Sequence, residues 1–358
     1  MSLTGDLLAL MAIPGLSGHE DRVRRAIAER LDAAGLAHRT DVLGNLIAEI
    51  PGDGPRVMIF THMDQLGFVV RRIEDDGALR VERLGGVPER TMAAQAVTVG
   101  TRAGDLTGVI ATKAHHATQP DEKYVVLKAP EIRIDCGFST RAEAEAAGVR
   151  IGDPVTWRAQ ALELANGRIA GTSVDDRAGC AVLLDLARRW ADAPPGPPVA
   201  LVWSVQEEFN LRGAQVAAQA LAPRIALQID LMLATDTPDM ADRGDMRLGG
   251  GPGISLYSFH GRGTLNGVIP HPALVRLFED TAAATAIPLQ RSAQTGVLTD
   301  LSYVQLVGEG VAALDLGFPM RHSHSPVEMV DPADLTQLAD LLAAALPRIG
   351  PDFALDRD

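Results

Sequence analysis

Cysteine is scarce in this chain, and its scarcity excludes two kinds of site. Among 358 residues only Cys136 and Cys180 are cysteines, and neither stands in a CxxC-type pair. A disulfide framework needs several paired cysteines, and a thiolate zinc site needs closely spaced ones. The sequence therefore predicts neither.

Runs of positive charge and long apolar runs are also missing. The formal net charge is −13 and no run of Lys and Arg stands out, so we expect no nucleic-acid partner and no acidic membrane partner. No apolar run approaches the roughly 20 residues that a bilayer-spanning helix needs. The first residues carry Asp6 and no basic start, which disfavours a secretory signal. We expect a cytoplasmic protein, part of whose negative charge would serve to bind cations.

What is present predicts a globular α/β fold. Hydrophobic residues make up 46% and charged residues 22%, which suits a protein with a buried core. Residues 17–34 predict a helix, with Ser17 and Glu20 as a capping box ahead of an apolar face. The other elements expected in this part of the chain are strands at 46–50, 56–61, 199–205, 225–229 and 311–316, and helices at 177–190, 210–221, 272–284 and 332–349.

The texture of the sequence changes between residues 67 and 158. Short β-like segments alternate there with Gly and charged turns, and helical periodicity is nearly absent before 141–147. We therefore predict one α/β unit, a mostly parallel sheet flanked by helices, interrupted by an inserted small β-barrel-like domain. The α/β catalytic unit would comprise residues 1–66 and 159–358, and the inserted domain residues 67–158.

Residues of metal-binding type follow the expected strands at one edge of the sheet. In open α/β sheets, ligands bind outside the carboxyl ends of the strands. Every such exit here carries His, Asp or Glu, as does the start of the helix at 177–190. Because it is improbable that several independent segments carry metal-binding residue types at the same edge by chance, we interpret them as one metal site. The residues are His62, Asp64, Asp175, Asp176, Glu207, Glu208, Asp230, His322 and His324.

Each of these residues also has an ordinary structural interpretation. A lone His at a strand end is more often a hydrogen-bonded structural residue, and adjacent glutamates usually mean a solvated loop. The pair Asp175–Asp176 would suit a helix cap. Asp236 and Asp239 lie close to Asp230 and are alternative ligands. Imidazole with carboxylate and without thiolate suits Zn²⁺ or Co²⁺ in a hydrolytic site, where two cations need a bridging carboxylate and a free acid–base group.

The segments that carry these residues resemble metallopeptidase family forty-two, the tetrahedral aminopeptidases that include glutamyl, leucyl and deblocking aminopeptidases. The resemblance runs over essentially the whole chain. Several short motifs in one order are far more specific than any one of them. The motifs are residues 14–20 (PGLSGHE), 62–68 (HMDQLGF), 173–179 (SVDDRAG), 205–208 (VQEE) and 321–328 (RHSHSPVE).

The resemblance implies a dinuclear, metal-dependent aminopeptidase that removes N-terminal residues from short peptides. Glu207 would be the general base acting on a water between the metals, and Asp64 would orient His62. The implied cofactors are two divalent ions per subunit, Zn or Co, with Mn also suitable. The implied ligands are His62, Asp175 and Asp230 for one metal, and Asp175, Glu208 and His324 for the other, with Asp175 bridging.

The same resemblance implies an assembly, and the sequence departs from the family pattern at two positions. The inserted domain would build dimers, and six dimers would close a hollow tetrahedral dodecamer; dimers alone are the alternative state. Members often have Glu where this chain has Gln65, and Tyr where it has His322, which we expect to support a ligand or lie on the surface. Thr299–Asp300 matches a usual Thr-Asp, for which we expect a structural role near the site.

Three other functions are alternatives. A metal-dependent N-acyl deacylase would use the same ligands on acylated amines. A glycosidase, a label sometimes given to relatives of the family, needs two carboxyls about 5–9.5 Å apart and would leave the His ligands idle. A non-catalytic scaffold would need neither intact ligands nor a base. Arg247, Arg262 and Arg291 would favour acidic substrates or, as we expect, are surface charges.

Overall fold

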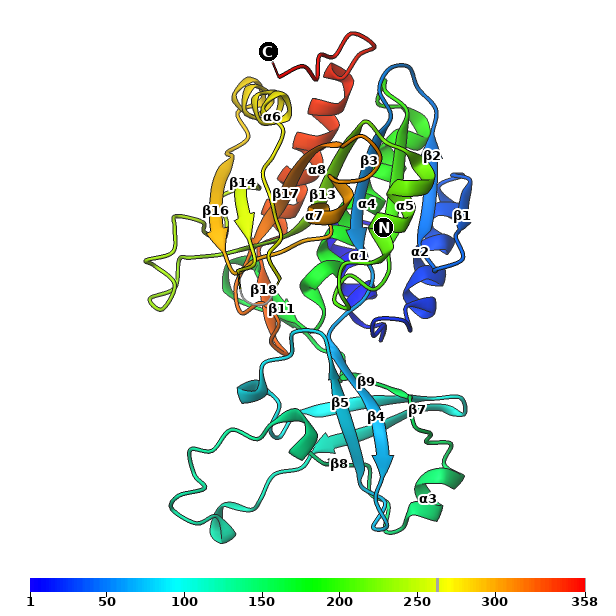
Figure 1. Ribbon diagram of the computed structural model, residues 1–358, viewed down its shortest axis with the longest axis vertical. Coiled ribbons are helices and arrows are strands. Elements are labelled where there is room, and N and C mark those ends of the chain that lie inside the picture. Colours follow the sequence, from blue (N-terminus) through cyan, green and yellow to red (C-terminus); the bar gives the residue numbers. More distant parts are fainter. Residues whose placement is uncertain (262–263, 358) are drawn as a thin grey trace.

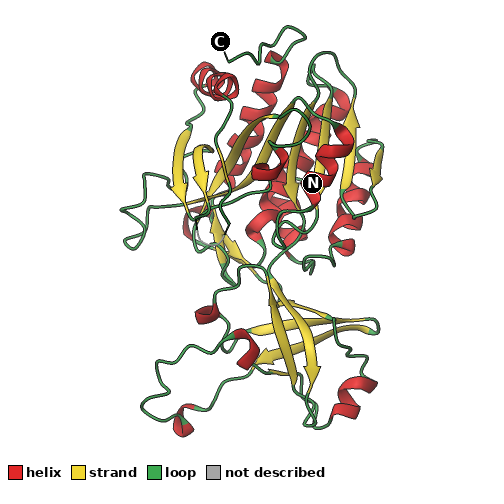
Figure 2. Ribbon diagram, in the orientation of Figure 1, coloured by secondary structure: helices red, strands yellow, loops and turns green. Residues whose placement is uncertain are grey.

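The computed structural model describes residues 1–261 and 264–357, which form two units joined end to end (Figure 1). The larger unit consists of a sheet with helices on both faces, and the smaller one is mostly strand and loop (Figure 2). Both chain ends belong to the larger unit, through α1 (Leu3–Met11) and α8 (Pro332–Ala345). The predicted α/β fold class with an additional small barrel is confirmed.

A nine-stranded sheet forms the centre of the larger unit. Its four middle strands are parallel, as predicted, whereas most pairings toward its edges are antiparallel. In spatial order the strands are β1 (His38–Thr40), β2 (Leu46–Ile50), β12 (Val199–Ser204), β3 (Val57–His62), β13 (Ile225–Leu233), β17 (Ala312–Met320), β14 (Gly253–Phe259) and β15 (Gly267–Val268), with β16 (Gln290–Thr295) paired to β14.

Helices bury both faces of this sheet. Strand β3 shows why: its alternate residues Val57 and Ile59 belong to one apolar core, and Met58 and Phe60 belong to the other. A strand buried on both faces reads as a continuous apolar run, because successive side chains point to opposite sides. One face is covered by α1, α2 (Asp21–Ala33), α4 (Val174–Asp192), α6 (Pro272–Thr285) and α8, and the other by α5 (Gly213–Leu221) and α7 (Leu301–Val304).

The smaller unit is a closed barrel whose strands all fall between residues 67 and 157. Its interior is apolar, and the rings of Phe68 and Trp157 meet edge to face at 5.4 Å between centroids. A helix, α3 (Arg141–Ala146), lies in the connection before the last strand. The strands in barrel order are β4 (Gly67–Ile73), β5 (Leu79–Leu84), β8 (Ile134–Asp135), β7 (Gly104–Ile110), β6 (Ala96–Thr101) and β9 (Pro154–Trp157).

A small three-stranded sheet and several 3₁₀ turns complete the described elements. The sheet runs β10 (Ala161–Glu163), β11 (Ile169–Gly171) and β18 (Glu328–Val330); β10 and β11 follow the barrel in the chain, and β18 follows β17. The 3₁₀ turns are Glu89–Thr91, His115–Ala117, Ala129–Glu131, Ala165–Gly167 and Leu346–Arg348.

The capping box predicted for α2 is wrong. The helix begins at Asp21, and its N-terminal flank Glu20 makes no side-chain capping bond. The Ser17 hydroxyl instead donates to Asp64, and the Glu20 carboxylate accepts from the backbone N–H of Gln206. Both side chains are directed at the loops of the functional site, and those tertiary contacts prevail over the local cap.

Several further boundaries differ from the expected ones by a few residues, among them the end of β17 at Met320 and not at residue 316, and two of the differences lie beside the site. Strand β13 was expected to end at residue 229 but extends to Leu233, because β17 pairs with it along its whole length. Helix α5 begins at Gly213 and not at residue 210, since Asn210 and Leu211 have φ angles of 67° and 56°, outside the helical region. Among the described residues, no helix combines the length and apolar composition needed to cross a membrane.

Candidate metal centre and active site

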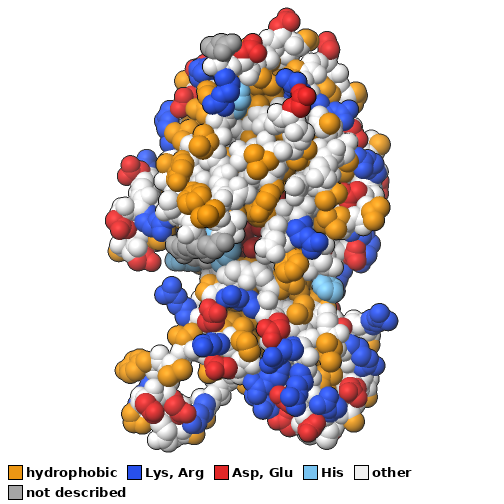
Figure 3. Space-filling view, in the orientation of Figure 1, with side chains coloured by type: hydrophobic (Ala, Val, Ile, Leu, Met, Phe, Trp, Pro, Cys, Tyr) orange, Lys and Arg blue, Asp and Glu red, His pale blue; other side chains and the backbone are white. Residues whose placement is uncertain are grey.

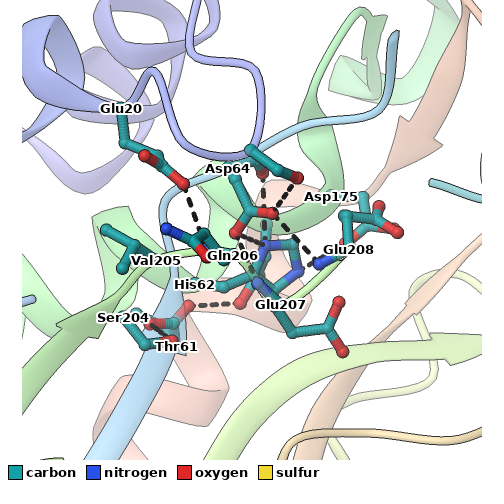
Figure 4. A network of polar contacts seen from close by, with 12 residues as sticks. Glu20, Thr61, His62, Asp64, Asp175, Ser204, Val205, Gln206, Glu207 and Glu208 are labelled. Atoms are coloured by element: carbon teal, nitrogen blue, oxygen red, sulfur yellow. Dashed lines mark hydrogen bonds and ion pairs between the residues drawn. The ribbon is translucent and has the colours of Figure 1, made fainter. Parts of the chain in front are cut away.

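The predicted site residues come together at the carboxyl edge of the parallel strands, where β3 leads into the barrel (Figure 1). Figure 4 shows His62, Asp64, Asp175, Glu207 and Glu208 close to one another. His62 is the last residue of β3, and the barrel begins a few residues later at Gly67. Asp230 lies within β13, two residues beyond Gln228, the last residue of that strand paired with β3. The other members are Asp175 at the start of α4, Glu207 and Glu208 after β12, and His324 between β17 and β18.

Two groups of three side chains are arranged as metal ligands and share one carboxylate. Ligand atoms of His62, Asp175 and Asp230 lie within 4.8 Å of one another, and so do those of Asp175, Glu208 and His324. His62 Nε2 lies 3.1 Å from Asp175 Oδ1, and His324 Nε2 lies 3.5 Å from Asp175 Oδ2. Asp175 therefore presents one oxygen to each group, the arrangement that a carboxylate bridging two cations requires.

Asp64 lies behind His62 and also holds the loop that follows β12. Its Oδ1 lies 3.5 Å from His62 Nδ1 and accepts the backbone N–H of Glu207 at 3.0 Å. Its Oδ2 accepts the N–H of Glu208 at 3.0 Å and the hydroxyl of Ser17 at 2.6 Å. Burial alone would raise the pKa of Asp64, but the hydrogen bonds from His62, Ser17 and Glu207 hold it below its usual value. An anionic Asp64 favours a proton on Nδ1, which leaves Nε2 free to bind a metal.

The acids of the site carry more negative charge than the described side chains around them offset. Burial, followed by the negative charge of Glu208, raises the pKa of Glu207 well above its usual value, although His62 opposes the shift. Burial and the charge of Asp175 likewise raise the pKa of Asp230 to about 7. Glu208 Oε1 is buried without a hydrogen-bond partner. Cations bound here would offset this charge and give that oxygen a partner, so the donor set fits a dinuclear site.

Glu328 positions two residues of the second group, Asp175 and His324. Its Oε2 accepts the backbone N–H of Asp175 at 3.0 Å, and its Oε1 accepts the N–H of His324 at 2.8 Å. His324 has a φ of 64°, so its backbone needs such an anchor. Glu328 ends the motif that contains His324, yet the sequence alone predicts no role for it.

Gln228 is a further residue whose role was missed, whereas Asp176 takes the helix-capping role that the sequence offered as the alternative to a metal ligand. Asp176 accepts the hydroxyl of Thr61 and the N–H of Gly179, the latter at 2.8 Å, and so ties the start of α4 to β3. Gln228 donates from Nε2 to Asp230 Oδ2 at 3.0 Å and thereby orients that carboxylate. A buried amide two residues before a ligand on the same strand face is the signal that would have indicated Gln228.

The alternative ligands considered from sequence lie outside both groups. Asp236 accepts Nε and Nη2 of Arg321 at 2.8 and 2.6 Å, which occupies both of its oxygens. Asp239 and His322 belong to neither group. Gln65, the first departure from the family pattern, is buried and accepts the N–H of Gly15 at 3.0 Å. Asp300 accepts from Ser204 at 3.3 Å, in keeping with a structural role near the site.

A cavity of about 540 Å³ opens onto both ligand groups and onto Glu207. In the space-filling view, acidic side chains are visible in a hollow just above the junction between the units (Figure 3). A larger groove of about 1310 Å³ between α2 and the β6–β7 hairpin includes none of the predicted ligands. The apolar wall of the smaller cavity consists of Pro88, Leu211, Leu231, Leu233, Val297 and Leu298.

The three arginines considered for substrate charge are not among the described lining residues. Arg291 is paired with Glu279 at 2.8 Å, and Arg247 is exposed outside the cavity. Arg262 lies outside the described residues.

Comparison with known proteins gives a consistent family. The M42 glutamyl aminopeptidase family matches residues 44–341. The lysyl aminopeptidase of Pyrococcus furiosus is 32% identical over 95% of this chain and 96% of its own length. The aminopeptidase APDkam598 of Desulfurococcus kamchatkensis has a TM-score of 0.90 at 36% identity, covering 97% of this chain and 95% of the other.

A third relative is the TET1 peptidase of Pyrococcus horikoshii, which can assemble into a tetrahedron or a large octahedral shell. Its TM-score is 0.87 at 29% identity, covering 96% of this chain and 98% of that one. The family match, the relatives named aminopeptidases and the shared fold together show that the chain belongs to the M42 glutamyl aminopeptidase family and is a peptidase, a hydrolase that acts on peptide bonds.

Proposed function

We propose that this protein is an aminopeptidase that uses two divalent cations to hydrolyse the first peptide bond of short peptides. The observation that carries the proposal is the pair of ligand groups sharing Asp175, beside a buried glutamate, Glu207, that belongs to neither group. A dinuclear hydrolase needs a bridging carboxylate and a separate base next to it. Asp175 and Glu207, which would fill these two roles, line the same cavity.

The two cations would each have their own ligands in addition to Asp175. When bound, they would polarise the scissile carbonyl and lower the pKa of water in the site. Imidazole and carboxylate donors suit Zn²⁺ or Co²⁺, and also Mn²⁺. His62 and Asp230 would complete one site, and Glu208 and His324 the other.

Glu207 would act as general base. Its side chain lines the cavity, and its backbone N–H is held by Asp64 at 3.0 Å, so the carboxylate is presented from a fixed loop. It would accept a proton from the attacking water and pass it to the leaving amine. Replacing Glu207 with Gln keeps the shape of the side chain and removes the basic oxygen, so turnover should fall while metal content stays unchanged.

The crowded carboxylates also support an exopeptidase. A free N-terminal ammonium group is a cation, so the acids around the metal groups would attract it and place the first peptide bond at the reacting position. An acylated amine carries no such charge. We therefore infer that a free N-terminus is required.

The assembly is proposed by likeness to the TET1 peptidase of Pyrococcus horikoshii. The barrel would build dimers, and dimers would close into a hollow particle that admits only short or unfolded peptides. Measuring the particle mass in solution separates a dodecamer from a dimer. The cytoplasmic location expected from the sequence stays a prediction.

The deciding experiment is hydrolysis of matched free and N-acetylated aminoacyl substrates, before chelation, after chelation, and with Zn²⁺ or Co²⁺ restored. Metal-dependent cleavage of the free amines alone would support the aminopeptidase. Cleavage of only the acylated substrates would favour an N-acyl deacylase on the same ligands. Activity that is unaffected by chelation would overturn the metal site, and a glycosidase assay would then become the next test.

A further inference from the structure

Three consecutive backbone N–H groups in the loop after β12 donate to buried carboxylates (Figure 4). The N–H of Gln206 donates to Glu20 Oε1 at 3.0 Å, and those of Glu207 and Glu208 donate to the two oxygens of Asp64 at 3.0 Å each. Glu20 is only 4% exposed. The proposed base and one proposed ligand therefore lie on a backbone whose amides are all held by acids from other segments.

The backbone of this loop needs to be held. Gln206 has a φ of 58°, in the left-handed region that residues other than glycine visit only at a cost. After Glu208 the chain turns back on itself, with the N–H of Leu211 donating to the carbonyl of Glu207 at 2.9 Å. A loop in such a conformation persists only where surrounding contacts determine it. The bond from Gln206 to Glu20 holds the N–H of the strained residue itself, while the carbonyl of Gln206 accepts the N–H of Arg212 at 3.3 Å.

The segment that carries Glu20 is itself fixed to the strand end beneath the site. Gly15 and Gln65 exchange two hydrogen bonds, at 2.9 and 3.0 Å. The same Glu20 oxygen that accepts from Gln206 also accepts the N–H of Gly18 at 2.7 Å, so the carboxylate cannot turn away without losing both donors. The segment is thus held in place, and its Glu20 carboxylate presents a fixed hydrogen-bond acceptor to the loop.

We propose that Glu20 is a positioning residue for Glu207: by holding the N–H of Gln206, it sets the direction in which the base enters the cavity. The inference rests on the proposed role of Glu207 as general base. Glu20 is not among the residues that line the cavity, and it belongs to neither ligand group, so it acts only through the loop. The contact requires an acceptor oxygen at the right distance and no negative charge.

This geometry gives different expectations for three substitutions. Glu20→Ala removes the acceptor, and since a misplacement of about 1 Å can cost 10²-fold, kcat should fall by about 10–100-fold with KM changed by less than about 3-fold. Glu20→Asp keeps the charge but shortens the side chain, so it should also lower kcat. Glu20→Gln loses the charge but keeps an oxygen at the same reach, so it should recover most of the activity.

A double-mutant test separates positioning from a general structural role. If Glu20 acts through Glu207, then Glu20→Ala in a Glu207→Gln background should lower the residual kcat by less than about 2-fold. Metal content and unfolding midpoint are measured for every variant. The matched control is Asp334→Ala, because Asp334 is also a buried acid that accepts two backbone N–H groups, from Gly249 and Gly251 at 2.8 Å each, outside the cavity.

The control should lower stability while leaving kcat close to the wild-type value. Loss of kcat in Glu20→Ala and Glu20→Asp, rescue in Glu20→Gln and no further loss in the double variant would support the proposal. Unchanged kcat in Glu20→Ala, or a loss that multiplies with that of Glu207→Gln, would overturn it and leave the proposed function standing. If Glu207→Gln itself kept wild-type turnover with both metals bound, the base assignment and this inference would fail together.

Discussion

Replacing Asp64 with Asn should weaken metal binding and slow turnover, although Asp64 belongs to neither ligand group. Both carboxylate oxygens accept backbone N–H groups, Oδ1 from Glu207 and Oδ2 from Glu208, each at 3.0 Å. An Asn side chain has one accepting oxygen, so in either orientation its NH₂ group would face a backbone N–H. The substitution also removes the negative charge behind His62 Nδ1 that favours the metal-binding tautomer.

Two independent considerations give the expected loss of metal affinity in Asp64→Asn. Changing the partner behind a metal-binding His costs about 10–100-fold in metal affinity, which corresponds to roughly 1.4–2.8 kcal/mol. Loss of a hydrogen bond to a charged group at a buried site costs about 1.5–3 kcal/mol. The two ranges overlap, so we expect the affinity for the cation that His62 would hold to fall by at least about tenfold.

The assay is chelator competition for Zn²⁺ and Co²⁺, followed by kcat at saturating metal. Asp334→Asn is the matched control, because that carboxylate also accepts two backbone N–H groups, both at 2.8 Å, away from the metal groups. The control should lower stability to a similar extent without changing metal affinity. Wild-type metal affinity and kcat in Asp64→Asn would refute the role of Asp64 as the residue that orients His62 and the loop.

The remaining predictions concern pH, packing and the second ligand group. Burial raises the pKa of Asp315 to about 7, against the opposing hydrogen bond from Thr299, so the native state keeps a proton that the unfolded chain releases near pH 4. The unfolding free energy of the wild type should therefore decrease between about pH 4 and pH 7. Relative to wild type, the unfolding free energy of Asp315→Asn should rise by about 2–4 kcal/mol across that window in denaturant titrations. A difference between the two proteins that does not change with pH would contradict this. In Gly179→Ala the new Cβ would lie 2.3 Å from Thr61 Oγ1, so we expect a loss of about 1–3 kcal/mol in the same assay, whereas Gly350→Ala, with nothing within 4 Å, should be neutral. Glu328→Gln offers one oxygen where two accept N–H groups, so bound-metal analysis should show less than two cations per subunit at a chelator concentration that wild type withstands; full occupancy would show that the contact is dispensable.

Much of the fold follows from patterns along the chain. The apolar run at 57–60 predicts a strand buried on both faces, and β3 is that strand. The change in texture after residue 66 predicts a separate β unit, and the barrel strands begin at Gly67. Such patterns are local consequences of burial, because a strand covered on both sides must be apolar at every position. Helix α1 is not among the predicted elements, since the first residues were interpreted only with respect to a secretory signal.

For the site as well, some features can be predicted from the sequence and others only from the structure. The sequence predicts the kinds of ligand, His and carboxylate without thiolate, because each such residue follows a strand or opens a helix at the same edge of the sheet. The sequence could not show that Asp175 presents one oxygen to each group, or that Glu328 anchors both Asp175 and His324. These contacts join residues that are far apart along the chain, as in the bond between Asp175 and Glu328.

Ser17 and Glu20 show most clearly what the sequence determined and what only the tertiary structure decided. Their spacing ahead of an apolar periodicity determined that a helix follows, and α2 is that helix. The same spacing also suggested a capping box, which does not form. The tertiary fold decides otherwise, because it brings Asp64 and the strained Gln206 within reach of these side chains, and buried donors and acceptors must be satisfied where water is excluded. A local cap exchanges bonds that water would also supply, whereas a buried N–H without a partner has no such substitute.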